Sequence, residues 1–437
     1  MGSNSKLGLI EATSMAVGGM VGGGIFAAMG GVATEAGTLG WLSFLFAATV
    51  AMAAAYSCLT LNKARKGEGG PITYIQQFNG NTDIAGMAGW TFIAGYIGTN
   101  AMYATAFGTY LVGWAGWQDA FGGLARPVIS FAVIAGFVGI NLAGAHSSGK
   151  TEEIIVVIKV AILLGFGIAG LWMAMKRPQG VVSGFDNLGL GAITAAGIAF
   201  VAFEGWELLL YDQHKMEGGQ STLSKSIYYG IIISVIIYLI IVIVTTNLVP
   251  TLVKQNPNTA LNQLAHKVLP GLGVALMSIA ALLSTGSAIN ATIFSAGQFM
   301  ERMVEKNQLP DQFGSGNIDN PNRSILTIGL AAAAFSMAGS LGSVTQFSSV
   351  TFVILCGGLS LLAFRNHSKI NANRIITGGG FVGAVVVAVS LFYHLFQTKI
   401  HTFWLLICLL VAVFILEVLY FEHDWMIEEV EDAEKDV

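Results

Sequence analysis

The sequence predicts an all-α integral membrane protein with twelve transmembrane helices. Hydrophobic residues make up 54% of the chain, charged residues only 11%, and the mean hydropathy is +0.68. Soluble domains carry about 25% charged residues, so lipid must be the solvent of this chain. Continuous apolar runs of about 20 residues are long enough to cross a bilayer as helices. A transmembrane β-barrel would instead show alternating segments of about ten residues.

The apolar runs place the twelve helices near residues 7–31, 39–61, 84–114, 127–145, 154–175, 192–210, 227–248, 272–300, 325–337, 344–364, 375–396 and 402–421. The first run is too long to be the apolar part of a cleavable signal peptide. A short helix is expected in the connection at 250–271. Residues 1–437 are expected to form a single membrane domain that ends in an acidic, solvated tail at 422–437.

Lysine and arginine predict the orientation of the chain. If the N-terminus is cytoplasmic, most of the 21 lysine and arginine residues fall in segments on the inner side. Positive charge is enriched in cytoplasmic loops. We therefore expect a multi-pass protein of the cell membrane with both termini in the cytoplasm.

No residue pattern indicates an enzyme or a metal site. Cys58, Cys356 and Cys408 lie far apart within apolar runs, and the seven histidines show no metal-ligand spacing. No nucleophile–base arrangement and no nucleic-acid-binding pattern is apparent. We expect no metal, no cofactor and no nucleic-acid partner, whereas the oligomeric state is not predicted.

Two of the predicted helices contain an interruption. Helix 1 carries "MVGGGIFAAMG", in which Gly22, Gly23 and Gly24 are adjacent, and each glycine costs roughly 1 kcal/mol inside a helix. Helix 6 carries "AFEGWE" at 202–207, in which one glycine lies between two glutamates. Because helix 6 follows helix 1 at an offset of five helices, which is an odd number, the two halves enter the membrane from opposite sides. Interrupted helices at matching positions of inverted halves indicate the central site of a secondary transporter.

An unwound turn inside the membrane exposes backbone groups that can bind a ligand. The freed N–H groups at the start of a half-helix attract an anion such as a carboxylate, and freed carbonyl groups suit an ammonium group. The aromatic residues Phe26, Phe203 and Trp206 flank the two interruptions. The sequence therefore predicts a site for a small zwitterion. The alternative is helix packing, because Gly18/Gly22 and Gly19/Gly23 form small-xxx-small pairs.

Three ionisable residues within the predicted spans are candidates for a functional role. Glu204 and Glu207 each cost about 2.5–3.5 kcal/mol at the membrane centre if charged. Each is either a functional group or a protonated side chain bonded to a freed carbonyl. Glu204 would favour a cationic ligand if it faced the site. Lys159, in "EEIIVVIKVAILLGFG", lies deep enough in helix 5 to bind and release a proton in each cycle, because burial disfavours its charged form. Its alternative is a lysine that snorkels to the inner surface.

Four segments resemble the amino acid–polyamine–organocation (APC) superfamily of permeases. "GMVGGGIF" resembles the family's helix 1 signature and "FVAFEGWE" its helix 6 signature. "GEGGPITYIQQFNG" resembles the loop after helix 2, and "STGSAINATIFSAGQFMERMVEKNQLP" resembles helix 8 and the loop beyond it. In two places the sequence differs from the family pattern. Gly23 replaces the usual serine or alanine, and "YDQHKMEGGQSTLSKSI" lacks a Glu-x-x-x-Asn-Pro run.

The resemblance implies a leucine-transporter (LeuT) type fold of five plus five helices in an inverted repeat. Repeat one would cover about 7–175, repeat two about 190–364, and two further helices about 375–421. Helices 1 and 6 would be unwound in the membrane. The implied substrate-binding residues are Gly22, Gly23 and Gly24 for the carboxylate and the carbonyls around Phe203 and Glu204 for the amine, with Ile25, Phe26, Gly205 and Trp206 beside them.

The resemblance also implies a coupling site. In some proton-coupled relatives a helix 5 lysine occupies the position of a sodium ion, and Lys159 matches that position, with Ser284 and Ser287 of helix 8 beside it. Glu207 is a further candidate for proton coupling. Sodium is less favoured, because a fixed positive charge about 4 Å away repels it by roughly 4 kcal/mol at an effective dielectric of about 20.

We therefore expect a secondary active transporter that carries amino acids by alternating access with proton-coupled symport. An exchanger of cationic amino acids or polyamines is the first alternative, and a non-transporting amino-acid sensor is the second. The expected partners are an amino acid and the lipid bilayer.

Overall fold

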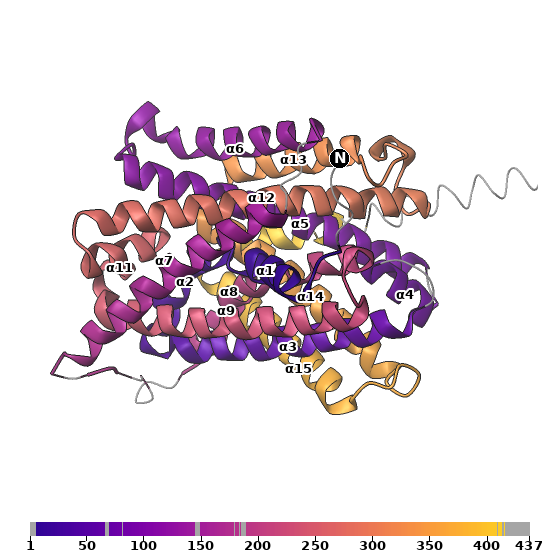
Figure 1. Ribbon diagram of the computed structural model, residues 1–437, viewed down its shortest axis with the longest axis horizontal. Coiled ribbons are helices and arrows are strands. Elements are labelled where there is room, and N and C mark those ends of the chain that lie inside the picture. Colours follow the sequence, from indigo (N-terminus) through magenta and orange to yellow (C-terminus); the bar gives the residue numbers. More distant parts are fainter. Residues whose placement is uncertain are drawn as a thin grey trace, which may run out of the picture.

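The computed structural model is helical throughout the part of the chain that it describes. It describes residues 6–65, 70–80, 82–144, 149–178, 180–182, 184, 189–408, 410–412 and 415. Within these ranges, eight segments are long and apolar enough to cross a membrane. Among the described residues, one isolated β-bridge is present, and it pairs Leu7 with Met216. The predicted all-α membrane architecture is confirmed at this level (Figure 1).

The first half of the chain forms helices at the first five predicted runs. Its elements are α1 (Leu9–Met20), α2 (Gly23–Ala36), the 3₁₀ turn η1 (Gly37–Leu39), α3 (Gly40–Ala64), α4 (Pro71–Asn79), α5 (Thr82–Ala115), the turn η2 (Ala120–Gly123), α6 (Ala125–Leu142) and α7 (Gly149–Met175). The first run holds two helices, α1 and α2, which are separated at the glycine triplet where an interruption was expected, and α2 continues past residue 31, the predicted end of the run.

The described residues of the second half are also mainly helical. Its elements are α8 (Gly191–Phe200), the 3₁₀ segments η4 (Val201–Phe203) and η5 (Trp206–Lys215), α9 (Gln220–Leu248), α10 (Pro250–Gln255), η6 (Pro257–Thr259), α11 (Ala260–Val268), α12 (Leu272–Glu305), η7 (Asp311–Phe313), α13 (Asn322–Ala338), α14 (Leu341–Arg365) and α15 (Arg374–Thr398). The short helix expected at 250–271 is present as α10 and α11. Of the twelfth run, residues 401–408 are helical, whereas most residues after 408, including the predicted tail at 422–437, lie outside the described residues.

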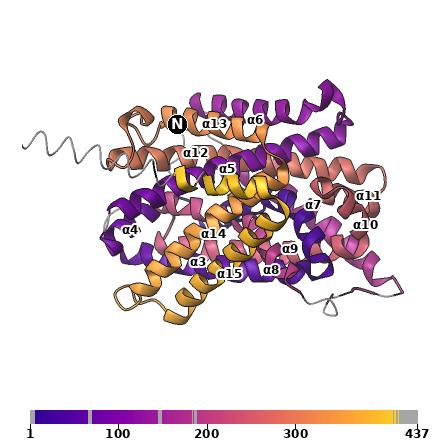
Figure 2. The ribbon, with the colours of Figure 1, turned by 180° about the vertical axis from the view of Figure 1, so that it is seen from behind.

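The two interrupted helices occupy the centre of the bundle. The most apolar stretch of the segment Gly191–Lys215 is 94% buried, whereas those of Ala125–Leu142 and Arg374–Thr398 are each only 28% buried. Figure 1 shows α1, α2 and α8 in the middle of the view, and both Figures 1 and 2 show α6 and α13 along one side and α3 and α15 along the other. The peripheral helices turn apolar side chains outward, as helices facing lipid do.

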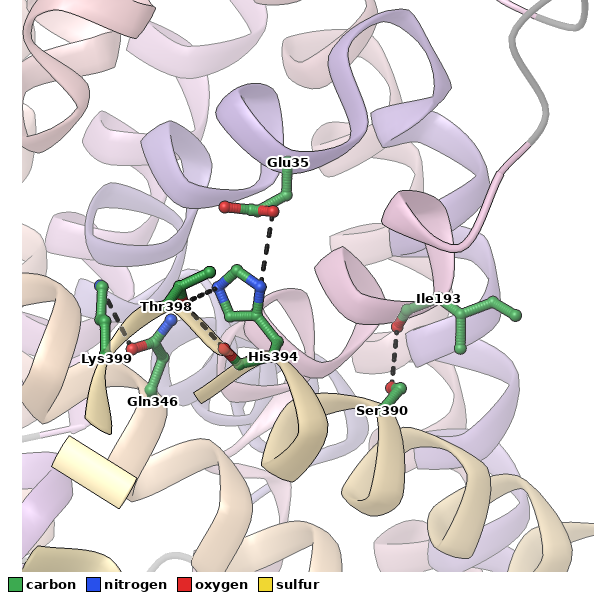
Figure 3. A network of polar contacts seen from close by, with 7 residues as sticks. All are labelled: Glu35, Ile193, Gln346, Ser390, His394, Thr398 and Lys399. Atoms are coloured by element: carbon green, nitrogen blue, oxygen red, sulfur yellow. Dashed lines mark hydrogen bonds and ion pairs between the residues drawn. The ribbon is translucent and has the colours of Figure 1, made fainter. Parts of the chain in front are cut away.

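Contacts between α15 and the two central half-helices hold one end of the bundle together. We call the end where α1 begins the inner end, after the predicted orientation, and the end where α2 stops the outer end. At the outer end the Glu35 carboxylate of α2 lies 3.6 Å from Nδ1 of His394 on α15. Nearby, the Ser390 hydroxyl donates to the carbonyl of Ile193 on α8 over 3.4 Å. Figure 3 shows that α15 thus holds the outer ends of both central half-helices.

Candidate functional site

The first interruption lies at the glycine triplet. Helix α1 ends at Met20 and α2 begins at Gly23, so Val21 and Gly22 connect the two in a non-helical conformation. No side chain of the described residues caps α2. The first four N–H groups of a helix have no partner within that helix. The N–H groups of residues 22–25 are therefore directed at the interruption, where the helix dipole is positive.

Close packing explains part of the glycine content. A Cβ atom on Gly24 would lie only 2.7 Å from Cα of Ala202, and one on Gly19 would lie 2.9 Å from the carbonyl oxygen of Gly205. A side chain at either position would therefore collide with backbone. The backbones of the two interruptions are in direct contact. The glycines are therefore explained by helix packing as well as by ligand binding.

Side chains from α7 and α12 bind the carbonyl groups at the end of α1. The Lys159 ammonium donates to the carbonyl of Gly18 over 2.8 Å, and the Ser284 hydroxyl donates to that of Val21 over 2.6 Å. The Lys159 side chain is fully buried, so it does not snorkel to the surface. The Ser287 hydroxyl instead bonds the Ser284 carbonyl of its own helix at 3.4 Å. The structure brings Lys159 and Ser284 together at this interruption.

One tyrosine joins the two interruptions. The Tyr238 hydroxyl of α9 lies 2.6 Å from the carbonyl oxygen of Met20 and 2.8 Å from that of Ala202, and it can donate to either. Its ring also packs edge-on against Phe203, with centroids 5.2 Å apart. The sequence reasoning did not identify Tyr238. Its only signal was a hydroxyl-bearing ring inside a run of isoleucine and valine.

The second interruption is built around a left-handed glycine. Segment η4 ends at Phe203, Glu204 is extended, and Gly205 has φ +110° before η5 begins at Trp206. The Glu207 carboxylate accepts a hydrogen bond from the N–H of Gly205 over 2.8 Å. Glu207 therefore satisfies a backbone donor of its own interruption, and no contact with Lys159 was found among the described residues.

Glu204 is buried with only half of its carboxylate bonded. Its Oε2 accepts hydrogen bonds from the hydroxyls of Thr99 on α5, over 3.0 Å, and Ser348 on α14, over 3.2 Å. Its Oε1 is buried and has no hydrogen-bond partner among the described residues. A buried acceptor without a partner is costly, so this oxygen is a position where a donor is needed.

The remaining predicted site residues are buried around the interruptions. Ile25, Phe26 and Trp206 are each at most 3% exposed. Phe26 packs edge-on against Tyr110 of α5, with ring centroids 5.4 Å apart. A Cβ on Gly23 would collide with the ring of Tyr103, another α5 residue that the sequence reasoning missed. Helix α5 thus supplies two aromatic rings to the first interruption.

A cavity of about 590 Å³ connects the interruptions with the inner end. It is lined at one end by Gly18, Gly19 and Gly205, and it extends to the exposed residues Lys215 and Asp319. The hollow therefore reaches the backbone contact between the two broken helices from the inner side. Among the residues that the structure describes, no group of three or more histidine, cysteine, aspartate or glutamate residues could hold a metal ion.

Comparison with known proteins gives a consistent assignment. A family model described as amino acid permease matches residues 7–418. The inner membrane transport protein YbaT of Escherichia coli is 27% identical over 94% of this chain and 96% of its own length. The serine/threonine exchanger SteT of Bacillus subtilis is 24% identical over 71% of this chain and 70% of its own length. The methylthioribose transporter of Bacillus subtilis is 22% identical over 84% of this chain and 83% of its own length.

Proposed function

Since the chain belongs to the amino acid permease family, we propose that it carries amino acids across the cell membrane by proton-coupled symport. Membership of this family makes it a multi-pass membrane transporter rather than an enzyme. The family implies an amino-acid-like substrate and a LeuT-type fold. We propose a five-plus-five inverted repeat over about 7–175 and 190–364 within one domain, with helices at about 375–421 trailing and both termini cytoplasmic.

The observation that carries the proposal is the meeting of two helix interruptions at the end of an inner cavity. The N–H groups of Gly22, Gly23, Gly24 and Ile25 form the seat for the substrate carboxylate, because no side chain of the described residues caps α2. The Phe26 ring borders this seat. A half-helix N-terminus facing an anion is a recurring device of transporters with broken helices.

The ammonium group of the substrate binds at the second interruption. The carbonyl groups around Phe203 and Glu204 accept its hydrogen bonds, and Gly205 and Trp206 border the seat. This assignment is supported by the extended backbone at Glu204, which takes these groups out of a helical hydrogen-bond ladder.

An inward-facing state is supported by the contrast between the ends. The cavity of about 590 Å³ reaches the interruptions from the inner end, whereas Glu35 and Ser390 contribute contacts that hold the outer end together. Alternating access would require these outer contacts to break when α2 and α8 move.

Lys159 is the proposed proton carrier. When protonated, its ammonium holds the Gly18 carbonyl of α1 at 2.8 Å. Loss of the proton removes the charge that strengthens this hydrogen bond and loosens α1 from α7. A protonated Lys159 also repels sodium, by roughly 4 kcal/mol for charges about 4 Å apart at an effective dielectric of about 20. Ser284 completes the coupling site by fixing Val21.

The test uses purified protein in liposomes with a panel of labelled amino acids. We expect uptake when the outside is made acidic, and less uptake as the outside pH rises, because the driving gradient then falls. Uptake driven by sodium and indifferent to pH would overturn proton coupling. Counterflow in the same liposomes separates a carrier from a non-transporting sensor, which would give none.

The Lys159→Ala variant tests the assigned carrier. We expect loss of pH-dependent uptake with retention of some exchange. Lys176→Ala is the matched control, because Lys176 stacks on Trp172 at 3.4 Å and is exposed. Unchanged pH dependence in Lys159→Ala would refute the role of Lys159.

One observation favours a second function, exchange of cationic amino acids or polyamines. The unpartnered Oε1 of Glu204 would accept a hydrogen bond from a basic group of such a substrate. In competition assays, we would then expect wild-type protein to prefer arginine over serine and Glu204→Gln to lose this preference. A Glu204→Gln protein that still prefers cationic substrates would count against this function.

A further inference from the structure

A second cavity at the inner end is lined by basic side chains. Its volume is about 430 Å³, and it shares no lining residue with the cavity that reaches the interruptions. Lys6, Arg65, His214 and Arg302 contribute the basic groups. They come from the segment before α1, the end of α3, segment η5 and helix α12, so four separate parts of the chain converge on one hollow.

Local contacts set the position of each arginine. The Arg65 guanidinium donates to Oε1 of Gln213 over 3.0 Å. The Arg302 guanidinium carbon lies 5.4 Å from the centre of the Tyr211 ring. Both Gln213 and Tyr211 line the same cavity. The contacts with Gln213 and Tyr211 orient the two guanidinium groups at the cavity.

Backbone pairing brings Lys6 to the cavity. The N–H of Leu7 donates to the carbonyl of Lys215 over 2.8 Å, and the N–H of Glu217 donates to the carbonyl of Leu7 over 2.9 Å. The start of α1 is thereby tied to the end of η5. Because Lys6 directly precedes this pair, its side chain is held at the cavity.

The lining residues that can be charged at neutral pH are all basic. None of the ten lining residues, all of which the structure describes, is acidic. Asp212 lines the other cavity and pairs with Lys215 at 2.7 Å. A smaller cavity that also contacts Arg302 is lined by one acidic residue, Glu305, and by a second basic residue, Lys306. Gly218 and Gly219 border the basic cavity just before α9, a 29-residue helix whose N-terminus also favours an anion.

We infer that this cavity is a binding site for a phosphate-bearing anion. Arginine guanidinium groups match phosphate oxygens in a two-pronged geometry, and several cations in one hollow suit a group that carries more than one negative charge. Basic pockets between membrane helices bind phosphorylated lipid headgroups on the cytoplasmic side. The same chemistry is presented by a soluble phosphate, so the experiment must separate these two sources. A bound anion links the start of α1 and η5 to α3 and α12.

The experiment measures thermal unfolding of the full-length protein in neutral detergent. One arm compares sodium phosphate with sodium chloride at equal ionic strength, and the other compares added phosphatidylglycerol with added phosphatidylcholine. We expect the unfolding temperature to rise in at least one arm. A rise with inorganic phosphate assigns a soluble ligand, and a rise with phosphatidylglycerol alone assigns a lipid headgroup. No rise in either arm overturns the inference.

Matched variants test whether the cavity itself is responsible. The double variant R65Q/R302Q should weaken the apparent affinity about tenfold or more, since hydrogen bonds to charged groups contribute about 1.5–3 kcal/mol each. The control K63Q/K225Q removes the same charge from exposed positions of α3 and α9 that do not line the cavity and should respond as the wild type does. An equal loss in both double variants would show a general charge effect and refute the site.

A milder variant guards against loss of the fold. Lys6 is exposed and lies outside the helices, so Lys6→Gln should leave the protein folded and still reduce the shift in unfolding temperature. If Lys6→Gln and R65Q/R302Q both fold and both keep the full shift, the inference fails. These measurements do not depend on which solute the protein transports.

Discussion

The two helix interruptions are stabilised in opposite ways. At the first one, side chains from other helices bind the exposed carbonyls, with Lys159 on Gly18 and Ser284 on Val21. At the second one, the interrupted segment supplies its own partner, because Glu207 binds the N–H of Gly205. Within the described part of the chain, Tyr238 is the one side chain whose hydroxyl lies within hydrogen-bond distance of carbonyl groups at both interruptions.

This difference teaches which interruption depends on the rest of the bundle. The carbonyl groups of the first are bonded only while α7, α9 and α12 stay in place, so movement of these helices changes its hydrogen bonding. The second retains its N–H bond through any motion that keeps residues 205–207 together. We therefore expect the first interruption to respond to conformational change and the second to act as a more rigid seat.

The largest loss of transport and of folded protein is expected from Gly205→Ala, because Gly205 lies where the two interruptions are in contact. A non-glycine residue at φ +110° costs about 1–3 kcal/mol of backbone strain, and its Cβ would lie 2.7 Å from the carbonyl carbon of Gly19. We expect loss of transport and a sharply lower yield of folded protein. Gly80→Ala is the control, because Gly80 has φ +72° with nothing within 4 Å. Equal damage in both variants would mean that strain alone, and not the contact, matters.

Tyr238→Phe should have the next largest effect because it affects both interruptions. The ring remains, but the carbonyls of Met20 and Ala202 lose their shared donor, at a cost of roughly 1–3 kcal/mol. Thermal unfolding and counterflow rates measure the result. Tyr228→Phe on the same helix is half-buried and should behave as the wild type does. A Tyr238→Phe protein with normal stability and counterflow would show that the hydroxyl does not join the interruptions.

Ser284→Ala should affect the first interruption alone. The Val21 carbonyl loses one hydrogen bond, so the expected loss of stability is about 1 kcal/mol. Because Val21 lies close to the Lys159 contact, we also expect less uptake for a given proton gradient while exchange is retained. Ser287→Ala is the matched control on the same helix. Loss of coupling in Ser287→Ala but not in Ser284→Ala would reverse the assignment.

Glu207→Gln should have the smallest effect, and it sharpens the comparison by testing the second interruption. The amide oxygen can still accept the hydrogen bond of the Gly205 N–H, so the free energy of unfolding should change less than in Ser284→Ala, where a carbonyl loses its donor. Liposome uptake measured against external pH should also stay as in the wild type. Loss of the pH dependence would move the proton-carrying role from Lys159 to Glu207.

Local sequence features determined the helices and the positions of both interruptions. A helix in lipid must bond its own backbone groups within one continuous segment, so apolar runs alone mark where helices lie. Three adjacent glycines and a glycine between two glutamates are likewise local signals, and α1 ends and η4 stops beside them.

Only the tertiary structure decided which side chains meet these interruptions. Thr99, Tyr238 and Ser348 lie far from them along the chain, and their hydroxyls look like any other polar group in an apolar run. The packing of α5, α9 and α14 around the broken helices brings them within hydrogen-bond distance. The same holds for Lys159, whose sequence position allowed either a surface anchor or a buried cation. A contact between distant segments depends on how whole helices pack, and the residues near either partner do not predict that packing.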